Sequence, residues 1–408
     1  MKSLKIHVKT LTVLCLMILF GAISCTKIPP NEEEKEEEPV LPPEEEKEEE
    51  KEDLVDLLDV ELEEYETSVY FKNRPGLYLE DGILKHEGEA FAGIGANFYG
   101  AFSNYFVENR KEFNNIFALL AGHGIGYCRI NIGLYHTADY KRWGQNKEMY
   151  FKRLDEVIRA AEHHNIGLIC SFFWTFGVAG YFDETELDWG KANSMSHKFM
   201  AQYARLFVKR YMESPAIWGY EFGNEINLQC DIPHIDNGFK AEWIQPLLQE
   251  FAEIVKKNDP YGRIVTSGCS EPRPSQYNLR MNNSWKTDTR EEWAQALTWF
   301  NPPPMGCNSV HIYDPENRFL PSSQNTYTNL IKAYMEESAK QRKALFIGEF
   351  HGLNNKCEEI IDAIVANRAP ISAVWAVGTV EYSLSADPSR QNAVLNYIED
   401  ANKKLKNK

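Results

Sequence analysis

Several motifs that mark common enzyme classes are missing from this sequence of 408 residues. It has no glycine-rich loop that could hold a phosphate group, and no Gly-x-Ser-x-Gly turn that could present a serine nucleophile. Its eight cysteines are not spaced as zinc ligands are. These absences argue against a P-loop nucleotide-binding protein, a serine hydrolase and a zinc protein.

The cysteines fall into three groups with different expected roles. Cys15 and Cys25 lie in the N-terminal leader described below. Three others lie inside predicted strands, where we expect small core residues, and three lie in predicted loops, which leaves room for one disulfide. The strand cysteines are Cys128, Cys170 and Cys269, and the loop cysteines are Cys230, Cys307 and Cys357.

A basic region is also missing from the part of the chain that is expected to fold. The net charge of −16 belongs mainly to the N-terminal tail, since residues 32–53 contain 14 acidic residues and only 3 lysines. The chain from residue 67 onward is close to neutral. Binding to nucleic acid requires a basic face, so we expect no nucleic-acid partner.

Residues 1–25 have the organisation of an export signal. Lysines at positions 2, 5 and 9 precede the apolar segment 11–20, which is too short to span a membrane permanently. Small residues and then Cys25 follow. This arrangement resembles the signal of bacterial lipoproteins, and the resemblance implies that Cys25 is lipidated and becomes the mature N-terminus. Ordinary signal cleavage beside an incidental cysteine is the alternative.

Residues 26–66 are predicted to form a disordered acidic linker. Two glutamate-rich blocks are separated by prolines at positions 39, 42 and 43. Like charges without apolar periodicity keep such a chain extended. An acidic stretch close behind a lipidated cysteine also resembles the sorting tag of surface-exposed lipoproteins in Bacteroidetes-type bacteria. We therefore expect an exported protein that is lipid-anchored at the outer membrane or cell surface.

From residue 67 to residue 408, apolar strands alternate with amphipathic helices. A hairpin of 77–79 with 83–85 is predicted on the turn Asp81-Gly82. Eight candidate strands follow, at 91–97, 127–132, 166–173, 217–225, 264–270, 309–313, 345–349 and 373–376. Such alternation implies right-handed crossovers and a parallel sheet, and eight repeats favour a single (β/α)8 barrel domain. Residues 270–309, polar and rich in proline and asparagine, are predicted to form a long loop.

Two of the predicted strands end in glutamate, at Glu225 and Glu349. The C-terminal ends of all barrel strands converge on one face, so these two carboxylates can share one cleft. Glycoside hydrolysis needs such a pair: one carboxyl gives a proton to the leaving oxygen, and the other attacks or activates water. Arg129, at the second predicted strand, would favour the ionised form of a neighbouring carboxylate.

The residues around this pair resemble clan A glycoside hydrolases, most closely family 5, over nearly all of residues 67–408. Gly223-Asn224-Glu225 matches the fourth-strand motif, which implies that Glu225 is the acid/base and that Asn224 binds the sugar 2-hydroxyl. Ile347-Gly348-Glu349-Phe350 matches the seventh-strand motif, which implies that Glu349 is the nucleophile. The resemblance also implies that no metal or organic cofactor is required.

Four further positions match the substrate-binding residues of the family. Arg129 in Cys128-Arg129-Ile130-Asn131 matches the second-strand arginine. His311 and Tyr313 match the sixth-strand pair, in which the tyrosine contacts the nucleophile. Trp375 matches the eighth-strand tryptophan that lies under the cleaved sugar.

The third predicted strand departs from the pattern of the cellulases in this family. Many of them carry a histidine where this chain has Ser171-Phe172-Phe173-Trp174. An aromatic residue there is more like the β-mannanase branch, and we predict that Trp174 contacts substrate. Residues 226–228, however, do not match the mannanase pattern closely. We therefore expect a monomeric, retaining endo-β-glycosidase, with β-mannan as the first candidate substrate and β-glucan as the next.

Two other functions are compatible with the same scaffold. The first is a surface lipoprotein that binds glycans and has lost catalysis, although such a protein would have no need for a matched acid and nucleophile. The second is a transglycosylase, which shares every catalytic residue and differs in whether water or a sugar resolves the intermediate.

Overall fold

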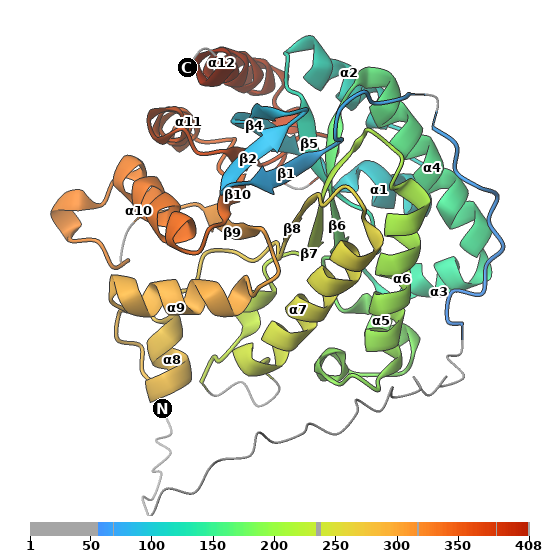
Figure 1. Cartoon of the computed structure of the whole chain (residues 1–408), viewed down its shortest axis with the longest axis horizontal. Coiled ribbons are helices and arrows are strands. Elements are labelled where there is room, and N and C mark those ends of the chain that lie inside the picture. The colour runs from blue at the N-terminus through green and yellow to red at the C-terminus, as the bar shows by residue number, and fades with distance from the viewer. Residues whose placement is uncertain (1–55, 68, 234–237, 316–317, 381, 407–408) are drawn as a thin grey trace, which may run out of the picture. The chain divides into compact units, whose positions relative to one another are not determined.

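Eight parallel strands form a barrel at the centre of the protein, and helices surround it (Figure 1). The barrel strands are β4 (Gly93–Asn97), β5 (Tyr127–Asn131), β6 (Gly167–Phe173), β7 (Ile217–Gly223), β8 (Ile264–Thr266), β9 (Cys307–Ile312), β10 (Ala344–Phe350) and β11 (Ile371–Val374). They are paired in the order β8-β7-β6-β5-β4-β11-β10-β9. Where β8 and β9 lie side by side, Gly306 N–H donates to the Val265 carbonyl (3.2 Å). The predicted (β/α)8 barrel is therefore confirmed.

This computed structural model describes residues 56–67, 69–233, 238–315, 318–380 and 382–406. The expected signal sequence, the expected lipidation site Cys25 and residues 26–55 of the expected linker lie outside the described residues. Among the helices that the structure describes, none is both long and apolar enough to cross a membrane.

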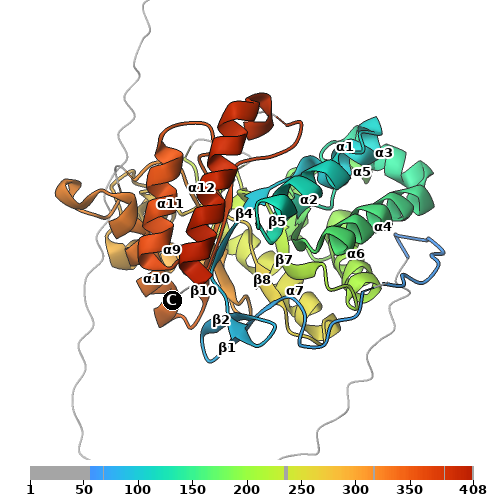
Figure 2. The same ribbon diagram turned by 90° about the horizontal axis from the view of Figure 1, so that it is seen from above.

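The helices follow the strands along the chain and cover the outside of the barrel (Figure 2). They are α1 (Gly100–Glu108), α2 (Phe113–Gly122), α3 (Thr137–Gln145), α4 (Lys147–His164), α5 (Gly177–Tyr181), α6 (Met195–Tyr211), α7 (Ala241–Asn258), α8 (Gln276–Asn282), α9 (Arg290–Phe300), α10 (Tyr327–Lys340), α11 (Lys356–Asn367) and α12 (Pro388–Lys406). Side-chain caps fix several of their starts. Ser194 accepts from the His197 amide before α6, and Thr326 accepts from the Asn329 amide before α10.

The segment that was predicted to be one long loop, 270–309, contains two helices, α8 and α9. The signal for α9 was present in the sequence. Thr289 and Glu292 form a capping box, in which each side chain accepts from the backbone amide of the other residue. Trp293, Leu297 and Phe300 then recur at helical spacing and are buried. The loop prediction was wrong for α9 because it weighed the proline and asparagine content of the whole segment above the helical spacing of these apolar residues.

The boundary of the folded part also differs from the expectation. Residues 56–66, predicted to belong to the linker, lie against the outside of α4 and α6. Leu58 and Tyr65 are buried, the Tyr65 hydroxyl donates to Glu162 (3.0 Å), and Arg210 donates to the Glu63 carbonyl (2.7 Å). Residues 56–66 accordingly belong to the folded part. Apolar side chains spaced through this acidic segment, together with these hydrogen bonds, hold it against the helices.

Several strands end earlier than predicted, among them two whose ends carry residues of the predicted site. The fourth barrel strand, β7, ends at Gly223, so Asn224 and Glu225 belong to the connection that follows it. The last strand, β11, ends at Val374 and leaves Trp375 outside the sheet. In both cases the functional side chain stands just beyond the last paired residue. An aromatic residue or carboxylate at a strand end does not show where the hydrogen-bond ladder stops.

An antiparallel hairpin covers the N-terminal end of the barrel (Figure 2). Its strands are β1 (Leu77–Glu80) and β2 (Ile83–His86), and the short strand β3 (Glu89–Ala90) pairs with β2. The predicted hairpin is confirmed: Asp81 and Gly82 both have positive φ, as a two-residue turn of this kind requires. Leu77 and Leu84 pack on Trp218 inside the barrel. Trp218 is therefore a core residue at this end of the barrel.

All six cysteines in the described part of the chain are buried free thiols. Cys128 and Cys170 lie in β5 and β6, as predicted for small core residues. Cys307, predicted to lie in a loop, begins strand β9, and Cys357 lies in α11. The disulfide for which the sequence left room is absent among these residues.

Candidate active site

The C-terminal end of the barrel collects charged and polar side chains that are almost completely buried. They come from five different strands or strand ends and include Asn97, Arg129, Glu221, His311 and Glu349. In a closed barrel these strand ends surround one point, which is why residues far apart in sequence meet there. The opposite end of the barrel is lined by apolar and aromatic side chains.

Arg129 is the centre of this group and is completely buried. Its guanidinium donates to Glu221 (2.7 Å), Glu349 (2.8 Å) and Asn97 (3.0 Å). A further bond runs to the side-chain oxygen of Asn224 (2.9 Å). One fixed positive charge thus orients two carboxylates and two amides. A rigid, always charged fork suits this role better than a lysine would.

Glu221 is a member of the site that sequence reasoning missed. It lies inside β7, is completely buried and pairs with Arg129. Burial raises the pKa of its carboxyl, while the charge of Arg129 and hydrogen bonding from Ser171 and Arg129 oppose the shift. The sequence did contain a signal for this residue. A glutamate between Tyr220 and Phe222, within an apolar strand, must have a buried cationic partner.

Glu349 has both carboxylate oxygens occupied by donors. Arg129 donates to Oε1 (2.8 Å), and the Tyr313 hydroxyl donates to Oε2 (2.6 Å). Burial, followed by the charge of Glu349, raises the pKa of Tyr313, so that the phenol keeps its proton and remains a donor. Only 4% of the Glu349 side chain is exposed. The carboxylate of Glu349 is therefore held in one orientation and is almost completely shielded from solvent.

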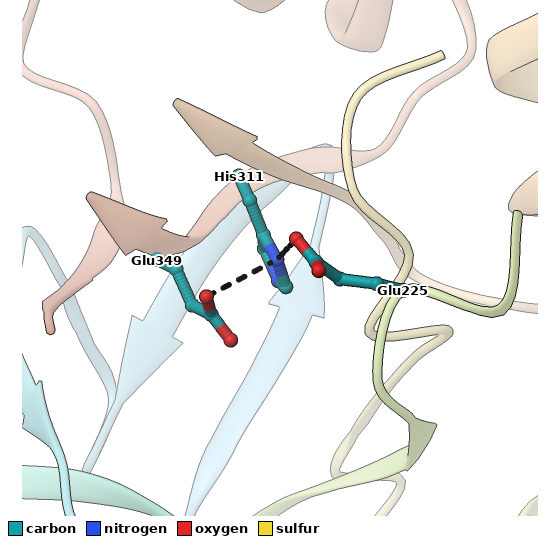
Figure 3. A group of neighbouring side chains, drawn as sticks. All are labelled: Glu225, His311 and Glu349. Atoms are coloured by element: carbon teal, nitrogen blue, oxygen red, sulfur yellow. Dashed lines mark hydrogen bonds and ion pairs between the residues drawn. The ribbon is translucent and has the colours of Figure 1, made fainter. Parts of the chain in front are cut away.

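Glu225 stands opposite Glu349, with His311 between them (Figure 3). Its backbone has a φ of +52°, a conformation that is uncommon outside glycine and that turns the chain sharply at the end of β7. The amide of Glu225 donates to the Gly268 carbonyl (2.9 Å), which fixes this turn. Its side chain is 29% exposed, much more than that of Glu349. Glu225 is therefore the more accessible of the two carboxyls.

His311 sets the protonation of Glu225. Its Nδ1 lies 2.8 Å from Glu225 Oε1 and 3.6 Å from Glu349 Oε2. Burial raises the pKa of the Glu225 carboxyl. The hydrogen bond from His311 and the charges of His311 and Arg129 together lower this pKa by more than burial raises it. The net result is a pKa below the ordinary range. In the free protein Glu225 is thus ionised at neutral pH.

The two carboxylates are close enough to act on one bond. One ligand atom from each of Glu225, His311 and Glu349 lies within 4.8 Å of the others. Glycosidases that retain the anomeric configuration have carboxyl groups about 5–5.5 Å apart, and inverting ones about 6.5–9.5 Å apart. These three side chains could also hold a metal ion, but they are the same groups that would carry acid–base and nucleophilic chemistry.

Three aromatic rings form a wall beside the carboxylates. Tyr99 stacks on Trp375 (ring centroids 5.1 Å apart, planes at 14°) and on Trp174 (5.1 Å, 23°). The Trp174 indole N–H donates to the Ser171 hydroxyl (2.6 Å), and the Arg129 guanidinium lies 4.7 Å from the centroid of its ring. Flat apolar rings next to buried polar groups suit the faces and hydroxyls of a sugar. Tyr99, two residues beyond strand β4, had no distinguishing signal in the sequence.

The structure brings the predicted site residues together. Glu225, Glu349, Asn224, His311 and Tyr313 all lie within one connected set of hydrogen bonds and ion pairs around Arg129. Trp174 and Trp375 belong to the adjoining aromatic wall. Cys25, the predicted lipidation site, lies outside the described residues.

Solved structures show the same fold. An endo-1,4-beta-mannanase from Rhizomucor miehei superposes with a TM-score of 0.61 at 15% identity, covering 82% of this chain and 100% of that one. An endo-beta-1,4-mannanase from Thermotoga petrophila gives 0.56 at 16% identity, covering 78% and 77%. At these identities the likeness concerns the fold alone.

Sequence relatives include a probable mannan endo-1,4-beta-mannosidase A-1 of Aspergillus terreus, 30% identical over 26% of this chain and 28% of that protein. A probable mannan endo-1,4-beta-mannosidase A of Aspergillus clavatus is 26% identical over 43% of this chain and 50% of that protein. The matches thus span about a quarter to a half of these relatives. The family model for Cellulase (glycosyl hydrolase family 5) matches residues 86–379. With the fold, the site and most of the chain in agreement, the protein belongs to glycosyl hydrolase family 5.

Proposed function

We propose that the protein is an endo-acting glycoside hydrolase that cleaves a β-linked plant-type polysaccharide, β-mannan first, and retains the anomeric configuration. The observation that supports this most directly is the pair of carboxylates. Glu225 and Glu349 have oxygens within 4.8 Å of each other, well short of the spacing that leaves room for a water molecule in an inverting enzyme.

In the first step, a Glu349 oxygen attacks the anomeric carbon while the bond from that carbon to the leaving oxygen breaks. Arg129 and Tyr313 hold the attacking carboxylate in place. The proton for the leaving oxygen comes from Glu225. Its carboxyl is ionised in the free protein, but substrate that covers its exposed side chain removes water from around it, which raises the pKa. Binding thereby favours the protonated form that this step needs.

In the second step, Glu225 takes a proton from a water molecule that attacks the anomeric carbon of the glycosyl–Glu349 ester. The ester bond breaks, and Glu349 returns as a carboxylate. While the ester exists, Glu349 carries no negative charge, and His311 and Arg129 then favour ionised Glu225 more strongly. One group can therefore be acid first and base afterwards.

Two observations favour mannan among the β-linked polysaccharides. The named relatives and the solved structures described above are mannosidases and mannanases. At the end of the third barrel strand, β6, the chain has Trp174, whose ring adjoins Arg129. The matching family model carries the name Cellulase, so β-glucan is the next candidate.

A product profile tests the proposal. The protein is incubated with mannan, glucomannan, cellulose, mixed-linkage glucan and xyloglucan, and the products are separated by size. We expect reducing ends to appear fastest from mannan, with oligosaccharides of several lengths formed early, as endo action requires. Proton NMR of the first product formed should show the β-anomer. A first-formed α-anomer would overturn the retaining mechanism, and exclusive transfer to sugar acceptors would indicate a transglycosylase.

We also propose that the chain is exported and anchored in the outer membrane through a lipid on Cys25. The leader pattern and the acidic stretch behind it support this. Metabolic labelling with a radioactive fatty acid tests it, with Cys25→Ser as the matched variant. Label in the wild type and none in the variant is expected, together with release of the variant from the membrane fraction. Equal behaviour of the two proteins would contradict the anchor.

A further inference from the structure

A second buried cluster of charges lies in the connections that follow strands β8 and β9, next to those strands. Glu271, in the connection after β8, is 3% exposed. The Arg318 guanidinium forms an ion pair with its carboxylate, and the Tyr334 hydroxyl of α10 donates to it. The Tyr334 ring stacks on Trp293 of α9 (4.5 Å between centroids, planes at 9°). The cluster therefore joins two connections and two helices in the interior.

The connection that carries Glu271 also supports Glu225. The Gly268 carbonyl accepts from the Glu225 amide (2.9 Å). Asn227 and Ser270 are bonded in both directions: the Asn227 side chain donates to the Ser270 carbonyl (2.9 Å) and accepts from its amide (3.0 Å). Ser270 also helps to lower the pKa of the Glu225 carboxyl, after the larger effects of His311 and Arg129. Glu271 is the next residue along the chain.

The cationic partner of Glu271, Arg318, lies on the connection that follows strand β9, which also carries Tyr313. Arg318 is five residues beyond Tyr313, and its guanidinium donates to the Pro272 carbonyl (3.0 Å) as well as to Glu271. The Tyr327 hydroxyl donates to the Tyr313 carbonyl (3.0 Å). The Arg318–Glu271 pair thus ties the connection under Glu225 to the connection that holds the Tyr313 donor.

Glu271 depends on Arg318 for its charge. Burial raises the pKa of the Glu271 carboxyl to about 7, although the charge of Arg318, the hydrogen bond from Tyr334 and the charge of His311 all lower it. Without Arg318 the carboxyl would stay protonated and could no longer attract the second connection. Removing either partner should therefore have the same effect on the connection between them.

We propose that Glu271 is a positioning residue for Glu225. Paired with Arg318, it holds the segment 268–271 in place, and this segment sets the backbone turn and Ser270 against the Glu225 carboxyl. Glu271 itself contacts no substrate in this arrangement. The inference rests on the proposed function, because it assigns the effect to the proton donated by Glu225.

Two variants break the Glu271–Arg318 pair by removing one partner each, Glu271→Gln and Arg318→Met. The control, Asp259→Asn, breaks a comparable buried pair elsewhere. Asp259 and Arg263 form a buried ion pair (2.8 Å, side chains 1% and 0% exposed) just before strand β8, at the opposite end of the barrel. All three variants remove one charge from a buried pair on or near β8. Thermal melting of each protein shows which variants fold.

The first measurement compares leaving groups. A manno-oligosaccharide needs the proton from Glu225, whereas a dinitrophenyl β-mannoside has a leaving group that departs without one. We expect Glu271→Gln and Arg318→Met to lose at least about tenfold in kcat/KM on the oligosaccharide and less than about threefold on the dinitrophenyl substrate. Asp259→Asn should change both values by the same small factor.

The second measurement needs no activity. The pKa of Glu225 is followed by NMR in protein with ¹³C-labelled glutamate side chains, with Glu225→Gln used for assignment. We expect Glu271→Gln and Arg318→Met to raise the pKa of Glu225, because Ser270, which helps to lower it, is no longer held in place, and Asp259→Asn to leave it unchanged. An unchanged pKa in both cluster variants, or equal losses on both substrates, overturns the positioning role. Wild-type protein that cleaves no glycan overturns the proposed function instead, and the titration then still decides the structural link.

Discussion

The two ends of the barrel are built from the same strands but carry different side chains: apolar and aromatic ones at the N-terminal end, charged and polar ones at the C-terminal end. In β5, Tyr127 lies at one end and Arg129, two residues later, at the other. In β7, Trp218 precedes Glu221 by three residues. The first member of each pair joins an apolar cluster under the β1–β2 hairpin, and the second joins the ion pairs beside Glu349. Two or three residues along one strand thus separate side chains that pack in the core from side chains of the candidate active site.

The difference between the ends is also a difference in what holds them together. At the hairpin end, Trp218 packs against His86 (4.0 Å between ring centroids), Phe91 (5.5 Å) and Tyr127 (5.8 Å). Such contacts stabilise the fold in proportion to the apolar area that they bury. At the other end, buried ion pairs contribute little net stability, because desolvation offsets the attraction. We therefore expect a substitution that leaves Arg129 a charged partner to affect catalysis more than unfolding, and a truncation at the hairpin end to do the reverse.

The largest effect should follow from Glu349→Gln. The amide keeps the shape of the side chain but is not a nucleophile, so we expect kcat on mannan to fall by roughly 10⁴-fold or more. Initial rates of reducing-end release measure this. The melting temperature should change by only a few degrees, since Arg129 keeps Glu221 as a partner. A variant with wild-type rates would show that Glu349 is not the nucleophile.

At the opposite end, Trp218→Ala should reverse this pattern. Truncating a buried tryptophan typically costs about 3–5 kcal/mol of unfolding free energy. Urea denaturation measures that loss, and the kcat and KM of the folded fraction should stay within about twofold of the wild type. The exposed Trp243 (40% exposed) supplies the control, because Trp243→Ala should cost less than about 1 kcal/mol. Equal costs for the two variants would contradict the assignment of Trp218 to the core.

The sequence predicted which residues meet at the C-terminal end of the barrel better than it predicted the outer parts of the fold. Strand periodicity located the eight strands, and once a barrel was assumed, its geometry brought Arg129 and Glu349 together without any contact information. Glu221 was missed because a single carboxylate does not interrupt the apolar pattern of a strand. Its position inside an apolar strand indicates a buried cationic partner, and the structure identifies that partner as Arg129.

Long-range packing explains the other differences between prediction and structure. Residues 56–66 have an acidic composition that indicates a linker, but Leu58 and Tyr65 are buried against α4 and α6. Nothing local to the segment could show that a receptive surface existed. The aromatic wall is similar, since Tyr99 contacts Trp174 and Trp375 from distant parts of the chain.

His311→Gln should give a smaller effect that appears in the pH profile. His311 lowers the pKa of Glu225, so its removal should raise that pKa. Because the first step needs protonated Glu225, kcat/KM falls as pH rises through this pKa. The variant should therefore keep its activity to higher pH, while its rate at the optimum falls about tenfold through loss of a charged hydrogen bond. A high-pH limb displaced to lower pH would contradict the assigned role of His311.

The smallest effects should come from the same conservative substitution, tryptophan to phenylalanine, made once at each end of the barrel. Because the chemical change is identical, any difference between the two variants reflects the position. In Trp174→Phe the flat ring remains, but the donor to Ser171 and part of the contact with Arg129 are lost. A cation–π contact is worth about 0.5–1 kcal/mol, so we expect KM on mannan to rise roughly two- to fivefold with kcat little changed. In Trp218→Phe the melting temperature should fall while KM stays constant, because that ring packs in the core beneath the hairpin, at the opposite end of the barrel from Glu349. If both variants lost stability and neither changed KM, Trp174 would belong to the core, and the aromatic wall would have no part in binding sugar.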